Sequence, residues 1–174
     1  MAFPVKMTFG DKTWEFAGED AVKFIAASGM LRRNAEELEA GGVENTPIEL
    51  ALDGKKFQAS HVDDAMTCLK DSSWTLVQPK LVATNNLADL GLGAPSVVLL
   101  TKYSATDLFG VFAFAEYLEC PALRSLCLVK LASVAYIDSS ADTGTADAMV
   151  RCNLAGKTYD MAIEKEIAAS YKTL

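Results

Sequence analysis

The segment that most constrains the fold of this chain is residues 108–118, with the sequence LFGVFAFAEYL. It is apolar almost all round, and a helix of that kind has to be buried on most of its faces. Ser104-Ala105-Thr106-Asp107 precedes it and fits a helix-capping box. Phe109, Phe112 and Phe114 are therefore predicted to fill the centre of a domain.

Three more helices are predicted after this one. Cys120-Pro121 ends the buried helix and opens the next, because proline suits the first turn of a helix and not its interior. That second helix is expected to run to about Tyr136. Thr145 is placed to cap a third helix that Gly156 stops, and Thr158 to cap a fourth. Spacing by four puts one set of apolar residues on a single face of the fourth helix: Tyr159, Ile163, Ile167 and Tyr171.

The first part of the chain predicts a β-β-α-β-α order. Alternating apolar residues on both sides of Gly10-Asp11-Lys12 indicate a hairpin over residues 5–16. A helix follows from Gly18, Gly29 divides it in two, and its tail runs into a flexible acidic loop by residue 45. Residues 48–52 alternate as a strand, and a helix is predicted through residues 57–69.

Residues 71–103 give conflicting patterns. WTLVQPKLVA and SVVLL have the composition of strands, whereas NNLADLGLGAP between them is rich in glycine and turn-like. The sequence assigns no elements to this stretch.

Composition limits the possible partners. The chain has 174 residues, of which 51% are hydrophobic, which suits one domain or one domain with an appended lobe. Its net charge of −7 would repel nucleic-acid phosphates. No apolar run approaches the roughly 20 residues of a membrane-spanning helix, and the first residues lack the order of a signal peptide. These features predict a soluble intracellular protein that binds neither nucleic acid nor membrane.

No catalytic, metal-binding or cofactor-binding group is predicted. His61 is the single histidine and is expected to be half exposed on a helix. The sequence GLGAP at residues 91–95 lacks the later residues of a phosphate-binding loop. Asp63-Asp64 and Glu36-Glu37 are adjacent pairs whose side chains point in different directions on a helix, so they are interpreted as solvated surface.

The cysteines are predicted to be buried and reduced. They form no Cys-x-x-Cys pair and have apolar neighbours. Only Cys120 lies beside a helix start, where a thiolate is favoured. The four are Cys68, Cys120, Cys127 and Cys152.

Residues 106–132, TDLFGVFAFAEYLECPALRSLCLVKLA, resemble the S-phase kinase-associated protein 1 family. The likeness lies in Leu-Phe, a buried helix, a Tyr-Leu-acid ending and a leucine-rich helix that ends in an aliphatic residue and alanine. Residues 145–171 are similar to the two C-terminal helices of the family. The hairpin VKMTFGDKTWEF and the tripeptide GML at residues 29–31 resemble its opening hairpin and the end of its cross-helix.

The resemblance implies an α+β class with a BTB/POZ fold, in which helices cover a small β-sheet, and a C-terminal two-helix extension. Residues 1–135 would form the BTB/POZ-like domain and residues 136–174 the extension. The front of the chain alone also fits elongin C or other BTB domains. The last two helices favour the branch that binds F-box proteins.

The function that this resemblance implies is that of a non-enzymatic adaptor, cytoplasmic and nuclear, that links F-box proteins to a cullin in an SCF-type ubiquitin ligase. Cullin contact is carried over to Glu116 and Tyr117. For Phe109 and Phe112 a core role is favoured over an interface, and for the last helix the interface is favoured. The residues to which the resemblance gives F-box contact are Phe109, Phe112, Leu128, Leu131, Met149, Val150, Leu154, Ile163, Ile167 and Tyr171.

Several positions depart from the family pattern. Ala146 replaces a proline, Leu123-Arg124 replaces paired leucines, Glu116 replaces an asparagine and Tyr171 a tryptophan. An acid at Glu116 either selects a basic partner or abolishes cullin binding. Two other functions therefore stay open: a scaffold that joins an F-box-like protein to an assembly without a cullin, and a self-associating BTB protein that forms a homodimer when unbound.

Overall fold

The structure is a computed structural model that describes residues 3–77, 87–128 and 130. It combines a small three-stranded sheet with helices, which confirms the predicted α+β class. The elements are β1 (Val5–Phe9), β2 (Lys12–Phe16), α1 (Gly18–Ala27), α2 (Gly29–Ala40), β3 (Ile48–Ala51), α3 (Ala59–Asp71), the 3₁₀ turn η1 (Leu87–Leu90), α4 (Ala94–Lys102) and α5 (Ala105–Leu118). Residues 121–128 form a further helix.

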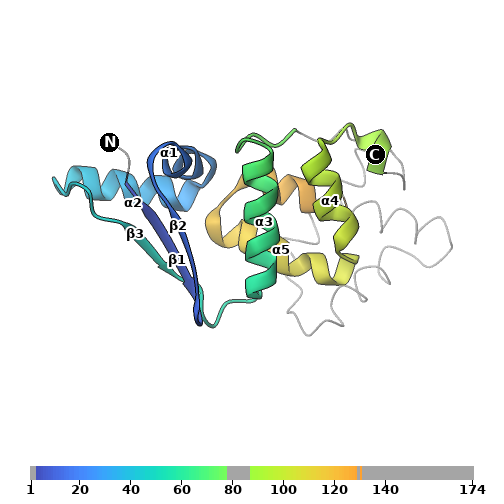
Figure 1. Ribbon diagram of the computed structural model, residues 1–174, viewed down its shortest axis with the longest axis horizontal. Helices are drawn as coiled ribbons and strands as arrows, with labels where there is room; N and C mark the ends of the chain where they lie inside the picture. Colours follow the sequence, from blue (N-terminus) through green and yellow to red (C-terminus); the bar gives the residue numbers. More distant parts are fainter. Residues whose placement is uncertain (1–2, 78–86, 129, 131–174) are drawn as a thin grey trace.

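These elements lie in two groups along an elongated molecule. Figure 1 shows the sheet, α1 and α2 toward one end, and α3, α4 and α5 toward the other. Within the second group α3 packs against both α4 and α5, and α2 contacts α5 across the boundary. One continuous hydrophobic core joins the two groups.

The sheet has the order β2-β1-β3. β1 and β2 form the predicted antiparallel hairpin, and β3 lies parallel to β1 on its other edge. Successive side chains of a strand point to opposite faces, and here one face is buried while Glu15 and Glu49 on the other are exposed. The buried face consists of Val5, Met7, Phe16, Ile48 and Leu50.

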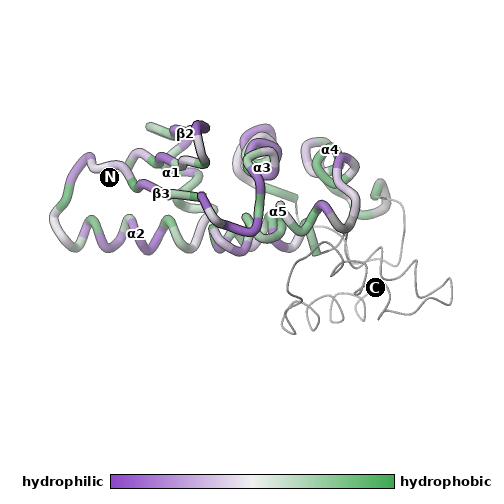
Figure 2. Tube along the Cα trace, turned by 90° about the horizontal axis from the view of Figure 1, so that it is seen from below, coloured by the Kyte–Doolittle hydropathy of each residue, from purple (hydrophilic) through white to green (hydrophobic). Residues whose placement is uncertain are grey.

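The predicted break between two helices at Gly29 is confirmed, and Ser28 is its physical cause. The Ser28 hydroxyl oxygen accepts a hydrogen bond from the Leu31 amide at 3.1 Å, so it caps the start of α2. α2 then continues to Ala40, and Figure 2 shows hydrophilic and hydrophobic residues alternating along it. Such a helix buries one side only.

The strand composition of residues 96–100 is misleading, because these residues lie inside α4. Gly93 occupies the N-cap and Pro95 the first turn, the positions that each residue type favours at a helix start. Leu99 and Leu100 are buried. Val98 in the same run is exposed, so the short apolar run indicated neither the conformation nor the burial of all its residues.

The buried helix predicted over residues 108–118 is confirmed as the body of α5. Ser104 caps it, accepting a hydrogen bond from the Asp107 amide at 3.2 Å. Phe112 and Phe114 are fully buried, and the helix ends where Glu119 turns to a φ of 51°. Residues 121–128 form the predicted next helix. The third and fourth C-terminal helices, and the domain boundary at residue 135, lie outside the described residues.

The end of α5 is bonded directly to the start of α2. The Ser28 hydroxyl donates to the Leu118 carbonyl at 2.5 Å, and the Gly29 amide donates to the Glu119 carbonyl at 2.9 Å. Arg33 forms a two-point ion pair with the Glu119 carboxylate. A β-carbon at position 29 would lie 2.8 Å from that carboxylate, so glycine permits the close approach. This joint fixes the sheet end of the molecule to the α5 end.

Candidate partner-binding surfaces

Of the residues implied to contact an F-box protein, those that the structure describes belong to the core. Phe109, Phe112 and Leu128 are all buried in the continuous hydrophobic cluster. In this conformation they contribute to packing rather than to an open surface, as was favoured for the two phenylalanines. The other residues of that set lie outside the described residues: Leu131, Met149, Val150, Leu154, Ile163, Ile167 and Tyr171.

Glu116, implied to face a cullin, forms an ion pair on the last turn of α5. Its carboxylate accepts from the Arg124 guanidinium, and 43% of the Glu116 side chain and 29% of the Arg124 side chain are exposed. Arg124 also lies 5.7 Å from the centre of the Phe112 ring. Glu116 and Arg124, which both depart from the family pattern, thus contact each other, and their opposite charges cancel.

Tyr117, the second residue implied to face a cullin, is half-buried beside a cation. Its ring centre lies 5.9 Å from that of Phe57, and the Lys55 ammonium lies 4.7 Å above it. Burial raises the pKa of the Tyr117 hydroxyl, so this group is a neutral donor at physiological pH. We refer to Lys55, Glu116, Tyr117 and Arg124 together as the Tyr117 face, since the resemblance implies that Glu116 and Tyr117 contact the same partner.

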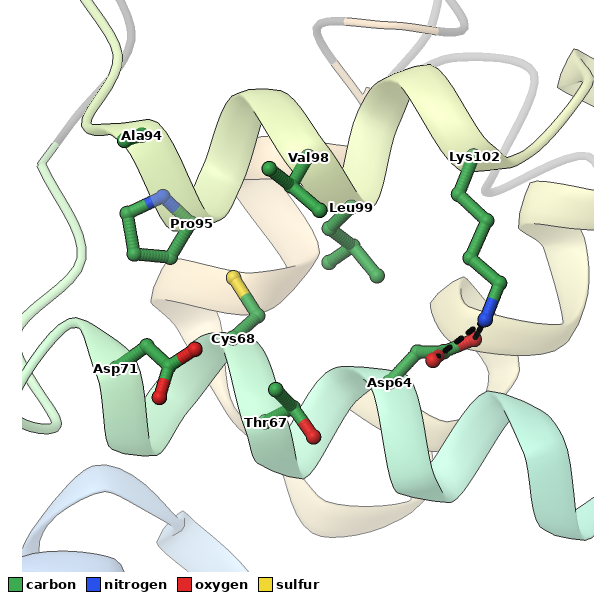
Figure 3. A pocket seen from close by; sticks show the side chains of 9 residues that line it. All are labelled: Asp64, Thr67, Cys68, Asp71, Ala94, Pro95, Val98, Leu99 and Lys102. Carbon is green, nitrogen blue, oxygen red and sulfur yellow. Dashed lines mark hydrogen bonds and ion pairs between the residues drawn. The ribbon is translucent and has the colours of Figure 1, made fainter.

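A cleft of about 270 Å³ lies between α3 and α4. Figure 3 shows the cleft with Lys102 reaching across from α4 to Asp64 on α3, an ion pair of 2.7 Å. Val98 is 68% exposed, and Asp71 carries a carboxylate at the other end. The volume is just below the range of about 300–1,000 Å³ that is typical of small-molecule sites. The cleft lining is Asp64, Thr67, Cys68, Asp71, Ala94, Pro95, Val98, Leu99 and Lys102.

The adjacent acids Asp63 and Asp64 point in different directions, as predicted, but they are not simply solvated. Asp63 accepts hydrogen bonds from Lys12 and from the Trp14 ring, whereas Asp64 accepts from Lys102 and Tyr103. Desolvation raises the pKa of Asp63, but the bonds from Lys12 and Trp14 outweigh it and lower the pKa overall. The Asp63 contacts therefore stabilise the fold above about pH 4 and are lost as the pH falls through the lowered pKa.

The expectation of a half-exposed His61 is wrong, because this side chain is only 8% exposed. Its Nδ1 accepts a hydrogen bond from the Gln58 amide at 3.0 Å, completing a capping box at the start of α3. A β-carbon built at Gly110 of α5 would lie 2.1 Å from the imidazole ring, so the ring occupies the space that this glycine leaves. His61 joins α3 to α5 and has a structural role.

The prediction of buried, reduced cysteines is confirmed for Cys68, Cys120 and Cys127, whereas Cys152 lies outside the described residues. Burial raises the pKa of each of the three thiols, in the case of Cys68 to about 11. Cys120, which sits at a helix start, is raised as well, so its position does not produce a thiolate nucleophile.

We expect Cys68 to resist alkylation although it lines the cleft. At pH 8 a pKa of about 11 leaves roughly one thiol in a thousand ionised, against about a quarter for an ordinary cysteine. Iodoacetamide labelling followed by peptide mass mapping, between pH 7 and 9.5, measures the rate at each cysteine. The urea-unfolded chain provides the reference, and equal rates in the folded and unfolded chain would contradict the prediction.

The described residues contain no cluster of three or more His, Cys, Asp or Glu side chains that could hold a metal ion. Within the same part of the chain, no helix is long and apolar enough to cross a membrane. Comparison of the chain with protein-family models, with curated proteins and with solved structures gave no match.

Proposed function

We propose that this chain is a BTB/POZ-type adaptor that joins an F-box protein to a cullin, acting in the cytoplasm and nucleus without chemistry of its own. The observation that carries the proposal is the order and packing of the described elements. The resemblance implies an opening hairpin, a cross-helix that ends at residues 29–31, a buried helix and a leucine-rich helix after it. The described part of the chain has the hairpin, the buried helix α5 and the helix of residues 121–128 in that order around one core, whereas residues 29–31 open α2 instead of ending α1.

The resemblance implies that the cullin and the F-box protein bind at opposite ends of the domain, as an adaptor requires. The Tyr117 face lies at the C-terminal end of α5, and Ser104 caps the other end of the same helix. A helix of 14 residues is about 20 Å long, so partners at its two ends need not compete. In the proposed assembly the cullin occupies the Tyr117 face, and the F-box protein contacts the predicted C-terminal helices.

Reconstitution from purified components tests this function. The full chain is mixed with a panel of cullin N-terminal domains and a panel of F-box segments, and the mass of each product is measured by light scattering after gel filtration. We expect a complex of three different chains. A chain that binds F-box segments but no cullin domain would support the scaffold without a cullin, and a chain of doubled mass that binds neither would support the self-associating protein.

A further inference from the structure

The charge of the Tyr117 face differs in sign from that of the whole chain. The chain carries a net charge of −7, yet on this face the Glu116 carboxylate is matched by Arg124 and the Lys55 ammonium has no carboxylate among the described residues. Lys56, the next residue, is also exposed and has no ion-pair partner in the same part of the chain. An exposed positive charge, that of Lys55, thus lies beside Tyr117.

Lys55 is presented in a way that keeps its charge available. Its ammonium lies 4.7 Å above the Tyr117 ring, an attraction that orients the side chain without neutralising it. The Tyr117 ring is in turn packed against Phe57, which is buried. A partner carboxylate can therefore meet a positioned cation and the half-buried tyrosine beside it.

Glu116 by itself left two expectations, a basic partner or no cullin binding, and its ion pair with Arg124 argues against the basic partner. A basic side chain of a partner would have to displace Arg124 from Glu116, whereas an acidic side chain meets Lys55 with no competitor among the described residues. Complementary charge at the rim of an interface speeds association and disfavours partners of the wrong sign.

We infer that the Tyr117 face binds an acidic segment of its partner, with Lys55 supplying the charge and Arg124 keeping Glu116 neutralised. This inference rests on the proposed function, because the partner in question is the cullin of the assembly. It adds the chemistry by which this chain would select among cullins: the preferred N-terminal domain carries carboxylates where it meets Tyr117.

Binding of the parent and three variants to the panel of cullin N-terminal domains tests the sign of the charge. Lys55→Gln is expected to weaken binding about threefold to fivefold, the range for one rim charge. Arg124→Gln is expected to weaken binding as well, because it leaves the Glu116 carboxylate without its ion pair. Glu116→Gln is expected to tighten binding, because it removes a negative charge from the face. Affinity of the parent should fall as salt is raised from 50 to 300 mM, since exposed charges are screened.

Lys102→Gln is the control, because it removes the same charge from the last residue of α4, near the other end of α5, where it also breaks the ion pair with Asp64. It should bind within about twofold of the parent, as expected for a charge outside the interface. Thermal unfolding of every variant checks that the fold is retained. If Lys55→Gln binds as tightly as the parent, or if Glu116→Gln weakens binding, the inference is overturned while the adaptor function stands. If no cullin domain binds the parent, the proposed function itself fails.

Discussion

Replacing Gly110 by alanine is expected to lower the free energy of unfolding by about 2 kcal/mol or more, although alanine is the better helix former. The new β-carbon would lie 2.1 Å from the Cε1 and Nδ1 atoms of His61 and 2.7 Å from its Cγ. The ring cannot stay where it is. If it rotates away, the Gln58 amide loses its acceptor and α3 loses its capping box, which typically costs about 1 kcal/mol, and the packing of the ring is lost as well.

A double-mutant cycle isolates the cause. With His61→Ala in place the space is empty, so adding Gly110→Ala should be neutral or stabilising by up to about 1 kcal/mol, the ordinary gain of alanine over glycine in a helix. Chemical denaturation of the four proteins gives the coupling energy. The same destabilisation in both backgrounds would contradict a clash with His61.

Gly29→Ala provides a comparison at another close approach. There the nearest atom is an oxygen at the end of the Glu119 side chain, and the next two contacts are 3.2 and 3.4 Å. A carboxylate can shift more easily than an imidazole ring held in a capping box. We therefore expect a cost smaller than that of Gly110→Ala.

The largest effect on binding is expected from Ile163→Asp combined with Ile167→Asp. Both residues lie outside the described residues, and the prediction comes from sequence spacing: positions four apart share a helical face, while Glu164 to Glu166 point in other directions. Two carboxylates buried at an interface cost several kcal/mol, so affinity for an F-box segment should fall about a thousandfold or more.

Thermal unfolding beside the binding titration distinguishes an interface from a core. The double variant should melt with the parent if this face binds the partner. A variant that melts far below the parent would place the face in the core and remove the F-box contacts proposed there. Lys165→Gln changes a residue on the opposite side of the helix and should leave both measurements close to the parent.

Sequence patterns correctly predicted those elements that are determined by residues close together in the chain. The hairpin over residues 5–16 follows from strict alternation, and Ser104 follows from the capping chemistry of its own side chain. α4 was obscured because Val97, Val98 and Leu99 suit a buried strand as well as a buried helix. The signal that resolves it was present, since Gly93 and Pro95 together mark a helix start.

Contacts between segments far apart in the chain could not be predicted from the sequence. His61 sits among polar neighbours, and only the packing of α3 on α5 at Gly110 buries it. Glu116 and Arg124 are eight residues apart, a spacing that suggests no contact across the turn at Cys120-Pro121. The sequence therefore did not predict the ion pair by which Arg124 neutralises Glu116 on the Tyr117 face.

The joint between Ser28 and Leu118 also has a consequence for synthesis on the ribosome. The hydroxyl that caps α2 donates to a carbonyl 90 residues later in the chain, and the neighbouring amide of Gly29 bonds to Glu119. The amino-terminal sheet and helices therefore emerge long before the residues that complete them, and domains generally fold as units while the chain is being made. Until α5 is released, Leu31 and Phe24 lack part of the core that buries them. The nascent chain thus has an interval, set by the rate of translation, in which a chaperone has apolar surface to bind.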